Sequence, residues 1–354
     1  MKNINPYTLM FGKEPVQMIS RIGETDEIYR NFLADVSPQQ VYMITGVRGS
    51  GKTVQMTEIS KRIQKEDNWI VVELNPANDL LVDLAAKLYN ESKAGEIIRS
   101  AKLNLSFWGI GVELDNSEKL TNIEVAVVKM LESLNKHKKR VLITIDEVTN
   151  SQEMKVFSSA FQIFVRKDLP VYLVMTGLYE NIDALQNEKT LTFLYRAPKI
   201  YLKALNMGSI ARQYKKTFEL ADEEVREMAR MTKGYSFAFQ VLGYCTYENK
   251  GDYKGAFDKY REYLDEYVYN KIWSELSAKD KKIMYVIATT EGGKISDIRE
   301  KLDMKSNEWS PYRERLIRRG LLNGNERGYI SFALPCFEDY VLDNYYMDYY
   351  NEIK

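Results

Sequence analysis

Residues 41–56 read VYMITGVRGSGKTVQM and contain the pattern G-x-x-x-x-G-K-[ST] without a gap. The run Val41–Ile44 before the pattern is apolar and begins and ends with a β-branched residue, which is typical of a buried strand, and the residues from Thr53 onward have a helical pattern. This strand–loop–helix context predicts a phosphate-binding loop, because the glycines let backbone N–H groups converge on an anion and the helix adds its positive N-terminal end.

The side chains at the end of this pattern predict the kind of ligand. Lys52 would reach the β- and γ-phosphates of a nucleotide, and the Thr53 hydroxyl would bind Mg²⁺. ATP and Mg²⁺ are therefore the expected cofactors. The residues expected to bind the nucleotide are Gly46, Val47, Arg48, Gly49, Ser50, Gly51, Lys52, Thr53 and Val54.

A second apolar strand ends in two acidic residues. The segment RVLITIDEVTN, residues 140–150, contains the short run Val141–Ile145 followed by Asp146 and Glu147. Asp146 would hold Mg²⁺, commonly through water, and Glu147 would act as the general base that polarises the attacking water. The alternative is an acidic turn in which one of these carboxylates caps a helix that begins near Ser151.

Further strands complete the pattern of a parallel sheet. The segment LPVYLVMTGL ends near Thr176, whose hydroxyl would act as a sensor between the metal-bound water and the γ-phosphate, or would only cap a helix or turn. The segments WIVVEL, residues 69–74, and APKIYLKAL, residues 197–205, are also strand-like, and helical stretches alternate with the strands. We therefore expect a sheet covered by helices on both faces, with the site at the carboxyl ends of its strands.

The composition bounds the class of protein. The chain has 354 residues, of which 45% are hydrophobic and 28% are charged, and this length suggests two or three folded domains. Lys and Arg together number 50, as do Asp and Glu, so any contact with nucleic acid must be local. Cys245 and Cys336 lie far apart, and no apolar run has the length of a signal peptide or membrane span. We expect a cytoplasmic protein with no membrane partner.

The segment AKLNLSFWGIGVEL, residues 101–114, interrupts the alternation of strands and helices. Its apolar and polar residues alternate around Trp108-Gly109, which predicts an inserted β-hairpin. The apolar face of the hairpin would consist of Leu103, Leu105, Phe107, Ile110, Val112 and Leu114. That face would either pack on the rest of the domain or dock a partner.

The C-terminal part of the chain predicts helices followed by a hairpin. From about Asn206 to Tyr267 the pattern is helical, and three amphipathic stretches follow, SAKDKKIMYVIATT, KISDIREKLDM and SPYRERLIRRGLL, before a short alternating pair around NGNER. In the third stretch Ser310 would cap the helix, Pro311 would take its first position and Gly320 would end it. This order of elements is that of a winged helix-turn-helix.

The predicted winged helix suggests a contact with duplex DNA. Its third helix would enter the major groove and its hairpin would touch the backbone. The segment 299–319 has more basic than acidic residues, while the tail after Phe337 is acidic. The candidates for DNA contact are Asn307, Ser310, Tyr312, Arg313, Arg318, Arg319 and Arg327. Winged helices also serve as packing domains, and the local charge permits both interpretations.

With these elements in order, nearly the whole chain resembles the AAA+-like ATPases, which include archaeal and bacterial ATPases with a winged helix, the origin-recognition initiators and the STAND signal-transduction ATPases. The resemblance rests on the phosphate loop, Asp146-Glu147, Thr176-Gly177, the arginine in LTFLYRAPKIYL, the segment GYSFAFQVLG and the C-terminal helices and hairpin. It implies an α/β fold with a P-loop NTPase parallel sheet of the ASCE or AAA+ type, followed by a helical lid domain and a C-terminal winged helix-turn-helix. The expected domains are 1–204, with the hairpin at about 101–114 inserted, 205–274 and 275–354.

The resemblance also implies roles for residues outside the phosphate loop. Arg196 would contact the γ-phosphate or a neighbouring subunit, Gly234 to Ser236 would form the lid turn near the nucleotide base, and Arg21 would belong to an N-terminal element beside the nucleotide. STAND proteins usually have Gly-x-Pro where this chain has Gly234-Tyr235-Ser236. In the N-terminal element, this chain has Ser20-Arg21 in place of the expected Gly-Arg dipeptide.

The nucleotide site and the winged helix together predict an ATP-dependent molecular switch. Mg-ATP would close the helical lid and the winged helix over the ATPase domain, and slow hydrolysis to ADP would release surfaces that engage duplex DNA or a protein. One alternative is a DNA-binding regulator in which the nucleotide is mainly structural. Another is a signalling or defence scaffold that forms homo-oligomers on ATP through the segment 101–114.

Overall fold

The fold is described by a computed structural model that covers residues 4–10, 15–101, 103, 105–110, 122–189, 191 and 193–352. The contacts within the chain divide it into two compact units. The sheet unit comprises Arg21–Thr45 and Lys52–Tyr201, and the helical unit comprises Met1–Ser20, Gly46–Gly51 and Leu202–Lys354. The segments 205–274 and 275–354 both fall in the helical unit, so their separation into two domains stays a prediction.

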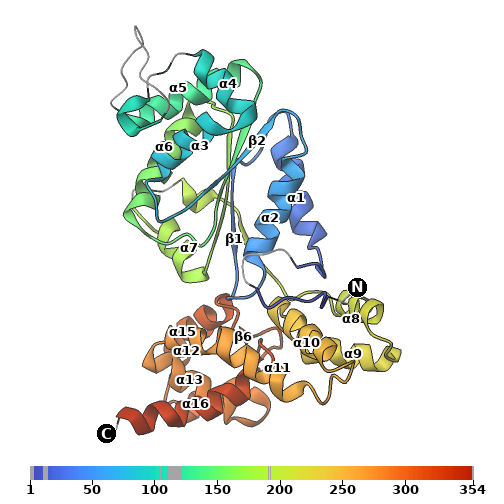
Figure 1. The fold of residues 1–354 in the computed structure, drawn as a ribbon. Coiled ribbons are helices and arrows are strands. Elements are labelled where there is room, and N and C mark those ends of the chain that lie inside the picture. Colours follow the sequence, from blue (N-terminus) through green and yellow to red (C-terminus); the bar gives the residue numbers. More distant parts are fainter. Residues whose placement is uncertain are drawn as a thin grey trace. The chain divides into compact units, whose positions relative to one another are not determined.

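A parallel sheet of five strands forms the centre of the sheet unit (Figure 1). The strands are β1 (Val41–Thr45), β2 (Trp69–Leu74), β3 (Arg140–Ile145), β4 (Val171–Gly177) and β5 (Lys199–Tyr201). They lie in the order β2-β3-β4-β1-β5, and every neighbouring pair is parallel. The expected α/β fold with a parallel sheet is confirmed.

Helices cover both faces of this sheet, with α1 and α2 on one face and α3, α6 and α7 on the other (Figure 1). The helices of the unit are α1 (Ile22–Leu33), α2 (Lys52–Ile63), α3 (Leu80–Asn90), α4 (Ser92–Ser100), α5 (Ile123–Lys136), α6 (Gln152–Arg166) and α7 (Tyr179–Gln186). Successive strand residues point to opposite faces. Met43 of β1 is buried in the core that includes α3 and α6, whereas Tyr42 packs on Phe32 of α1 with ring centroids 5.6 Å apart.

The structure corrects the hairpin expected at 101–114. Ser106–Trp108 forms a short 3₁₀ helix, η1, instead of a strand. Gly109 follows it with a φ of +70°, and Ile110 N donates a hydrogen bond to Leu105 O at 3.3 Å. This tight turn buries Leu105 and Ile110 together, so the alternating pattern arose from a compact turn and not from a pleated strand. Residues 102, 104 and 111–114 lie outside the described residues.

The helical unit contains the predicted helices and a short hairpin. Its helical elements are α8 (Met207–Thr217), α9 (Asp222–Met231), α10 (Ser236–Glu248), α11 (Phe257–Leu264), the π-helix η3 (Asp265–Tyr269), α12 (Asn270–Ser274), α13 (Ala278–Ala288), η4 (Glu291–Gly293), α14 (Ile295–Lys301), α15 (Ser306–Arg318) and α16 (Phe337–Glu352). β6 (Leu322–Asn323) and β7 (Ser331–Phe332) pair antiparallel after α15. Within the described part of the chain, no helix combines the length and apolar character needed to cross a membrane.

The start of α15 differs from the prediction. The helix begins at Ser306, so Pro311 lies inside it and not at its first position. Glu308 Oε2 accepts a hydrogen bond from Lys305 N at 2.8 Å, which satisfies a backbone donor just before the helix. Ser310 Oγ donates to Ser306 O at 2.8 Å instead of capping the helix. The predicted end is confirmed, since Gly320 follows the helix with a φ of +76°.

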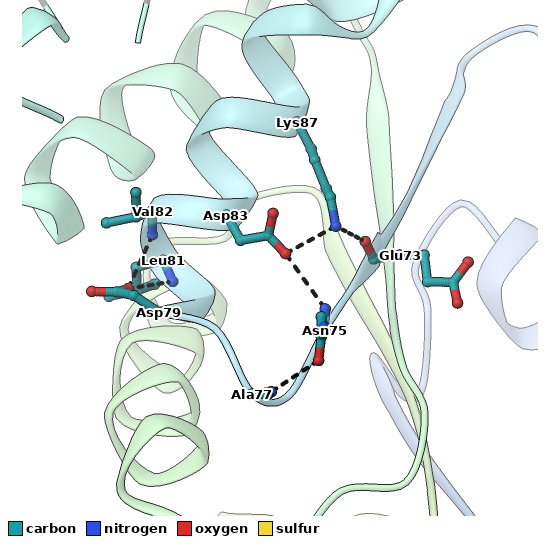
Figure 2. A network of polar contacts seen from close by, with 8 residues as sticks. All are labelled: Glu73, Asn75, Ala77, Asp79, Leu81, Val82, Asp83 and Lys87. Carbon is teal, nitrogen blue, oxygen red and sulfur yellow. Dashed lines mark hydrogen bonds and ion pairs between the residues drawn. The ribbon is translucent and has the colours of Figure 1, made fainter. Parts of the chain in front are cut away.

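The loop between β2 and α3 is fixed by a network of polar contacts (Figure 2). Asp79 Oδ1 accepts hydrogen bonds from Leu81 N and Val82 N, each at 3.1 Å, and so caps α3. Lys87 Nζ donates to Glu73 O at 2.6 Å and ties the same helix to the end of β2. The loop therefore has a defined shape at the carboxyl edge of the sheet.

Asp79→Ala is expected to lower the free energy of unfolding by about 0.5–2 kcal/mol, because two N–H groups at the start of α3 lose their acceptor. Equilibrium unfolding in urea, followed by circular dichroism, measures this change. Asp79→Asn keeps a side-chain oxygen and serves as the control, with a stability near that of the wild type. An equal loss in both variants would contradict the capping role.

Candidate functional site

The predicted phosphate loop has the expected setting in the chain. The segment Gly46–Gly51 follows the carboxyl end of β1 and leads directly into α2. Gly49 and Gly51 have φ angles of +74° and +91°, which residues other than glycine rarely adopt. Ser50 N donates to Val47 O at 3.1 Å and closes a turn within the loop. Backbone of this kind forms a concave set of N–H groups that suits an anion.

Asp146 accepts hydrogen bonds from two threonines at the carboxyl edge of the sheet. Lys52, Thr53 and Val54 form the first turn of α2, and Thr53 Oγ1 donates to Asp146 Oδ2 at 2.6 Å. Thr176 Oγ1, near the end of β4, donates to Asp146 Oδ1. The strand order explains this meeting, because β4 lies between β1 and β3. Three of the predicted site residues are therefore brought together.

Glu147 lies beside these residues and is exposed to solvent. Its carboxylate makes no hydrogen bond or ion pair with any residue that the structure describes. Its backbone N donates to Asp146 Oδ1 at 3.0 Å, and its φ of +52° is in the left-handed region. The main chain is thus held while the carboxylate is left accessible to water, which is the arrangement that a general base needs.

The alternative assignments as helix caps are not supported by the contacts. Ser151 caps α6 by accepting a hydrogen bond from Met154 N at 3.2 Å, so neither Asp146 nor Glu147 is needed there. The residue that precedes α7 is Leu178, not Thr176. Thr176 Oγ1 also accepts a hydrogen bond from Glu147 N at 3.3 Å, which is a turn-capping contact, so the sensor role of Thr176 stays a prediction.

The oxygen atoms of Thr53 and Asp146 suit Mg²⁺. This ion prefers oxygen ligands, keeps several waters and is commonly bound by one or two protein groups together with substrate phosphates. In the part of the chain that the structure describes, no group of three or more His, Cys, Asp and Glu side chains could hold a metal ion. By the general preference of this ion, a Mg²⁺ held by Thr53 and Asp146 would complete its shell with water and phosphate oxygens.

Residues of the helical unit hold the backbone of the phosphate loop. Tyr235 Oη donates to Arg48 O at 2.6 Å, and Arg48 Nη2 lies 3.2 Å from Glu275 Oε1 in an ion pair. Neither Tyr235 nor Glu275 is predicted from the sequence to contact the phosphate loop. No local pattern could reveal them, since Tyr235 and Arg48 are 187 residues apart in the chain.

The residues implied by the family resemblance occupy three different places. Gly234, with a φ of +74°, lies just before α10, and Ser236 is the first residue of that helix, while their role in a lid turn stays a prediction. Arg196 is exposed at the end of the 3₁₀ helix η2 (Leu194–Arg196), before the amino end of β5. Asp146 follows the carboxyl end of β3, so Arg196 and Asp146 belong to opposite ends of the strands. Arg21 precedes α1, and its carbonyl accepts a hydrogen bond from Thr25 N at 3.1 Å.

The candidates for DNA contact lie on α15 and on the hairpin. Asn307, Ser310 and Arg327 are exposed. Others make contacts within the helical unit, where Arg313 Nη2 donates to Gly324 O at 3.3 Å and Arg318 pairs with Glu314. Tyr312 lies beneath Lys279 and Arg315, and Arg319 is partly buried. The structure therefore brings the candidates onto adjacent elements, with some of them already engaged.

Comparisons with known proteins show which folds this chain resembles. Residues 266–341 match a family described as a domain of unknown function, DUF8462, and no curated protein matches the chain. The chain is similar to the Walker-type ATPase PABY2304 of Pyrococcus abyssi, with a TM-score of 0.61 and 16% identity, over 92% of this chain and 96% of that one. It is also similar to the ORC2 protein of Aeropyrum pernix in complexes with ADPNP and ADP, with a TM-score of 0.60 and 13% identity, over 97% and 98% of the two chains. The chain therefore has the fold of the Walker-type and origin-recognition P-loop ATPases, as the resemblance implied.

Proposed function

We propose that the protein is a Mg²⁺-dependent ATPase whose nucleotide state controls the helical unit. The observation that carries this proposal is the hydrogen bond of 2.6 Å between Thr53 Oγ1 and Asp146 Oδ2. It joins the last residue of the G-x-x-x-x-G-K-[ST] pattern to the acidic end of β3, and a Mg-nucleotide site needs both groups in one place. The likeness to two ATPases over nearly the full chain supports the same class of activity.

Each residue of the site has a proposed role in hydrolysis. The N–H groups of Gly46–Gly51 and the Lys52 ammonium bind the phosphates. Thr53 and Asp146 hold the metal, and Mg²⁺ neutralises the charge on the phosphate oxygens when it is bound. Glu147 orients the attacking water and accepts its proton. Thr176 fixes the Asp146 carboxylate and so acts as a positioning residue.

The helical unit is the proposed reader of the nucleotide state. Its helix α10 bonds to the backbone of the phosphate loop, and the same unit carries α13, α14, α15 and the hairpin β6-β7. We place the surface for duplex DNA or a protein partner on α15 and the hairpin, where Asn307, Ser310 and Arg327 are exposed. ATP and ADP would therefore present this surface differently.

The purified protein should hydrolyse ATP slowly in the presence of Mg²⁺, with turnover measured by phosphate release with and without duplex DNA. Turnover that is lost in Lys52→Ala and Glu147→Gln supports the proposed site. Stimulation by duplex DNA would identify DNA as the partner, and unchanged turnover would favour a protein partner. A wild-type chain that binds no ATP would contradict the proposal.

Thr176→Val is expected to reduce turnover by about tenfold without changing the Kd for ATP. The valine keeps the shape of a side chain that is 0% exposed, but Asp146 loses a hydrogen bond to its charged carboxylate. Thr144→Val, at a buried position in β3, is the matched control and should hydrolyse ATP at the wild-type rate. Equal turnover in the two variants would remove Thr176 from the site.

A further inference from the structure

Three consecutive carbonyl groups of the phosphate loop accept hydrogen bonds from the residues that begin α10. The bonds run from Tyr235 Oη to Arg48 O at 2.6 Å, from Phe237 N to Gly49 O at 3.1 Å, and from Ser236 Oγ to Ser50 O at 2.9 Å. The loop and α10 belong to the same compact unit. The start of α10 therefore contacts the loop along its backbone and not through one side chain.

The geometry of the peptide bond gives these contacts a consequence. In a planar trans peptide, the C=O of one residue and the N–H of the next point in opposite directions. Carbonyl groups of Arg48 and Ser50 that face α10 therefore turn the N–H groups of Gly49 and Gly51 away from it. The N–H of Ser50 is fixed as well, because it donates to Val47 O at 3.1 Å. The start of α10 thus sets the directions of the donors that would face a phosphate.

The surroundings of Tyr235 keep its hydroxyl group protonated and close to Gly49. The side chain of Tyr235 is buried, and this burial raises the pKa of its hydroxyl, which therefore stays protonated. A Cβ atom at Gly49 would overlap the Tyr235 hydroxyl and lie 3.0 Å from Phe237 Cβ. The backbone of the loop can approach α10 this closely only because residue 49 is glycine.

The contact from Ser236 depends on the residue present in this chain. The hydroxyl group of Ser236 makes this contact, and a side chain without a hydroxyl group, such as that of alanine, could not make it. The Oγ atom of Ser236 donates a hydrogen bond to Ser50 O. Ser236 thus adds a side-chain hydrogen bond to the phosphate loop.

We propose that Tyr235, Ser236 and Phe237 preorganise the phosphate loop, so that nucleotide binding and the attachment of α10 to the loop stabilise each other. This inference rests on the proposed function. The coupling is reciprocal by thermodynamic necessity, because whatever raises the affinity of the loop for nucleotide must also be strengthened by it. Arg48 extends the same connection to the end of α12 through its ion pair with Glu275. Tyr235 is therefore a positioning residue, which acts on the nucleotide through the loop.

Tyr235→Phe tests the inference because it removes one hydroxyl and leaves the ring. The Kd values for ADP and ATP should both rise by about three- to tenfold, as expected for the loss of one hydrogen bond. Tyr253→Phe is the matched control, since it removes a hydroxyl that donates to Glu227 at 2.7 Å in the same unit. Isothermal titration calorimetry of the full chain, well below its melting temperature, should show wild-type affinity for this control.

Hydrogen–deuterium exchange separates this coupling from a loss of stability. In the wild type, ADP should slow the exchange of the amides at 235–239, and this effect should shrink in Tyr235→Phe but persist in Tyr253→Phe. Unchanged or tighter nucleotide affinity in Tyr235→Phe would overturn the inference while the proposed function stands. A wild-type chain that binds neither ADP nor ATP would overturn the proposed function as well, so the two failures are distinguishable.

Discussion

Glu147→Gln is expected to lower ATP turnover by about 100- to 10,000-fold, the range that a general base contributes, while the Kd for ATP stays unchanged. The amide has the shape of the carboxylate but cannot accept a proton from water. The side chain is exposed and makes no hydrogen bond or ion pair with the described residues, so the substitution breaks no contact seen in the structure. Phosphate release at saturating Mg-ATP measures turnover, and calorimetric titration measures binding.

The control for this experiment is Glu153→Gln. Glu153 is also exposed and lies in the first turn of α6, a few residues after the acidic pair. It should keep wild-type turnover, which would show that the loss in Glu147→Gln does not come from removing one negative charge nearby. Full turnover in Glu147→Gln would rule out Glu147 as the base and would direct attention to water positioned by other groups.

The strands of the sheet could be predicted from the sequence because each is a short apolar run with a distinct end. Val41–Thr45 precedes the glycine loop, and Arg140–Ile145 precedes two acidic residues, so the strand and its functional end are read together. The sheet order could not be read in this way. It places β4 between β1 and β3, and the pairing of β4 with β3 explains how Thr176 reaches Asp146.

Two local predictions were wrong because the same sequence pattern is compatible with more than one local structure. Leu105 and Ile110 were assigned to a hairpin, but a 3₁₀ turn also places both in the core. Pro311 was assigned to the first position of a helix, where proline is common. The helix begins at Ser306 instead, and it tolerates the proline within it. Neither choice is visible without the surrounding structure.

The contacts between the phosphate loop and the other residues of the helical unit could not be predicted from the sequence for a different reason. Tyr235 follows a glycine and Glu275 follows a short helix, and neither position carries a recognisable motif. Both residues act on Arg48, more than 180 residues earlier in the chain. The motif predicts which residues surround a phosphate, whereas the groups that hold the motif in shape depend on tertiary packing.

Lys52→Ala is expected to weaken ATP binding by about 100-fold or more. The ammonium would make hydrogen bonds to the β- and γ-phosphates, and two charge-assisted bonds contribute about 3–6 kcal/mol, which corresponds to this change in Kd. Alanine is a good helix former, so α2 should keep its first turn. Lys61→Ala, in the last turn of the same helix, is the matched control and should bind ATP like the wild type.

The two variants together separate binding from hydrolysis. Lys52→Ala should lose both the affinity for ATP and the slower amide exchange of α10, because an empty loop cannot strengthen its contacts with Tyr235 and Ser236. Glu147→Gln should keep both while losing turnover. If Lys52→Ala kept wild-type affinity, the phosphates would not lie at this loop. If Glu147→Gln lost the protection of α10 along with turnover, the helical unit would respond to hydrolysis itself and not to the bound nucleotide.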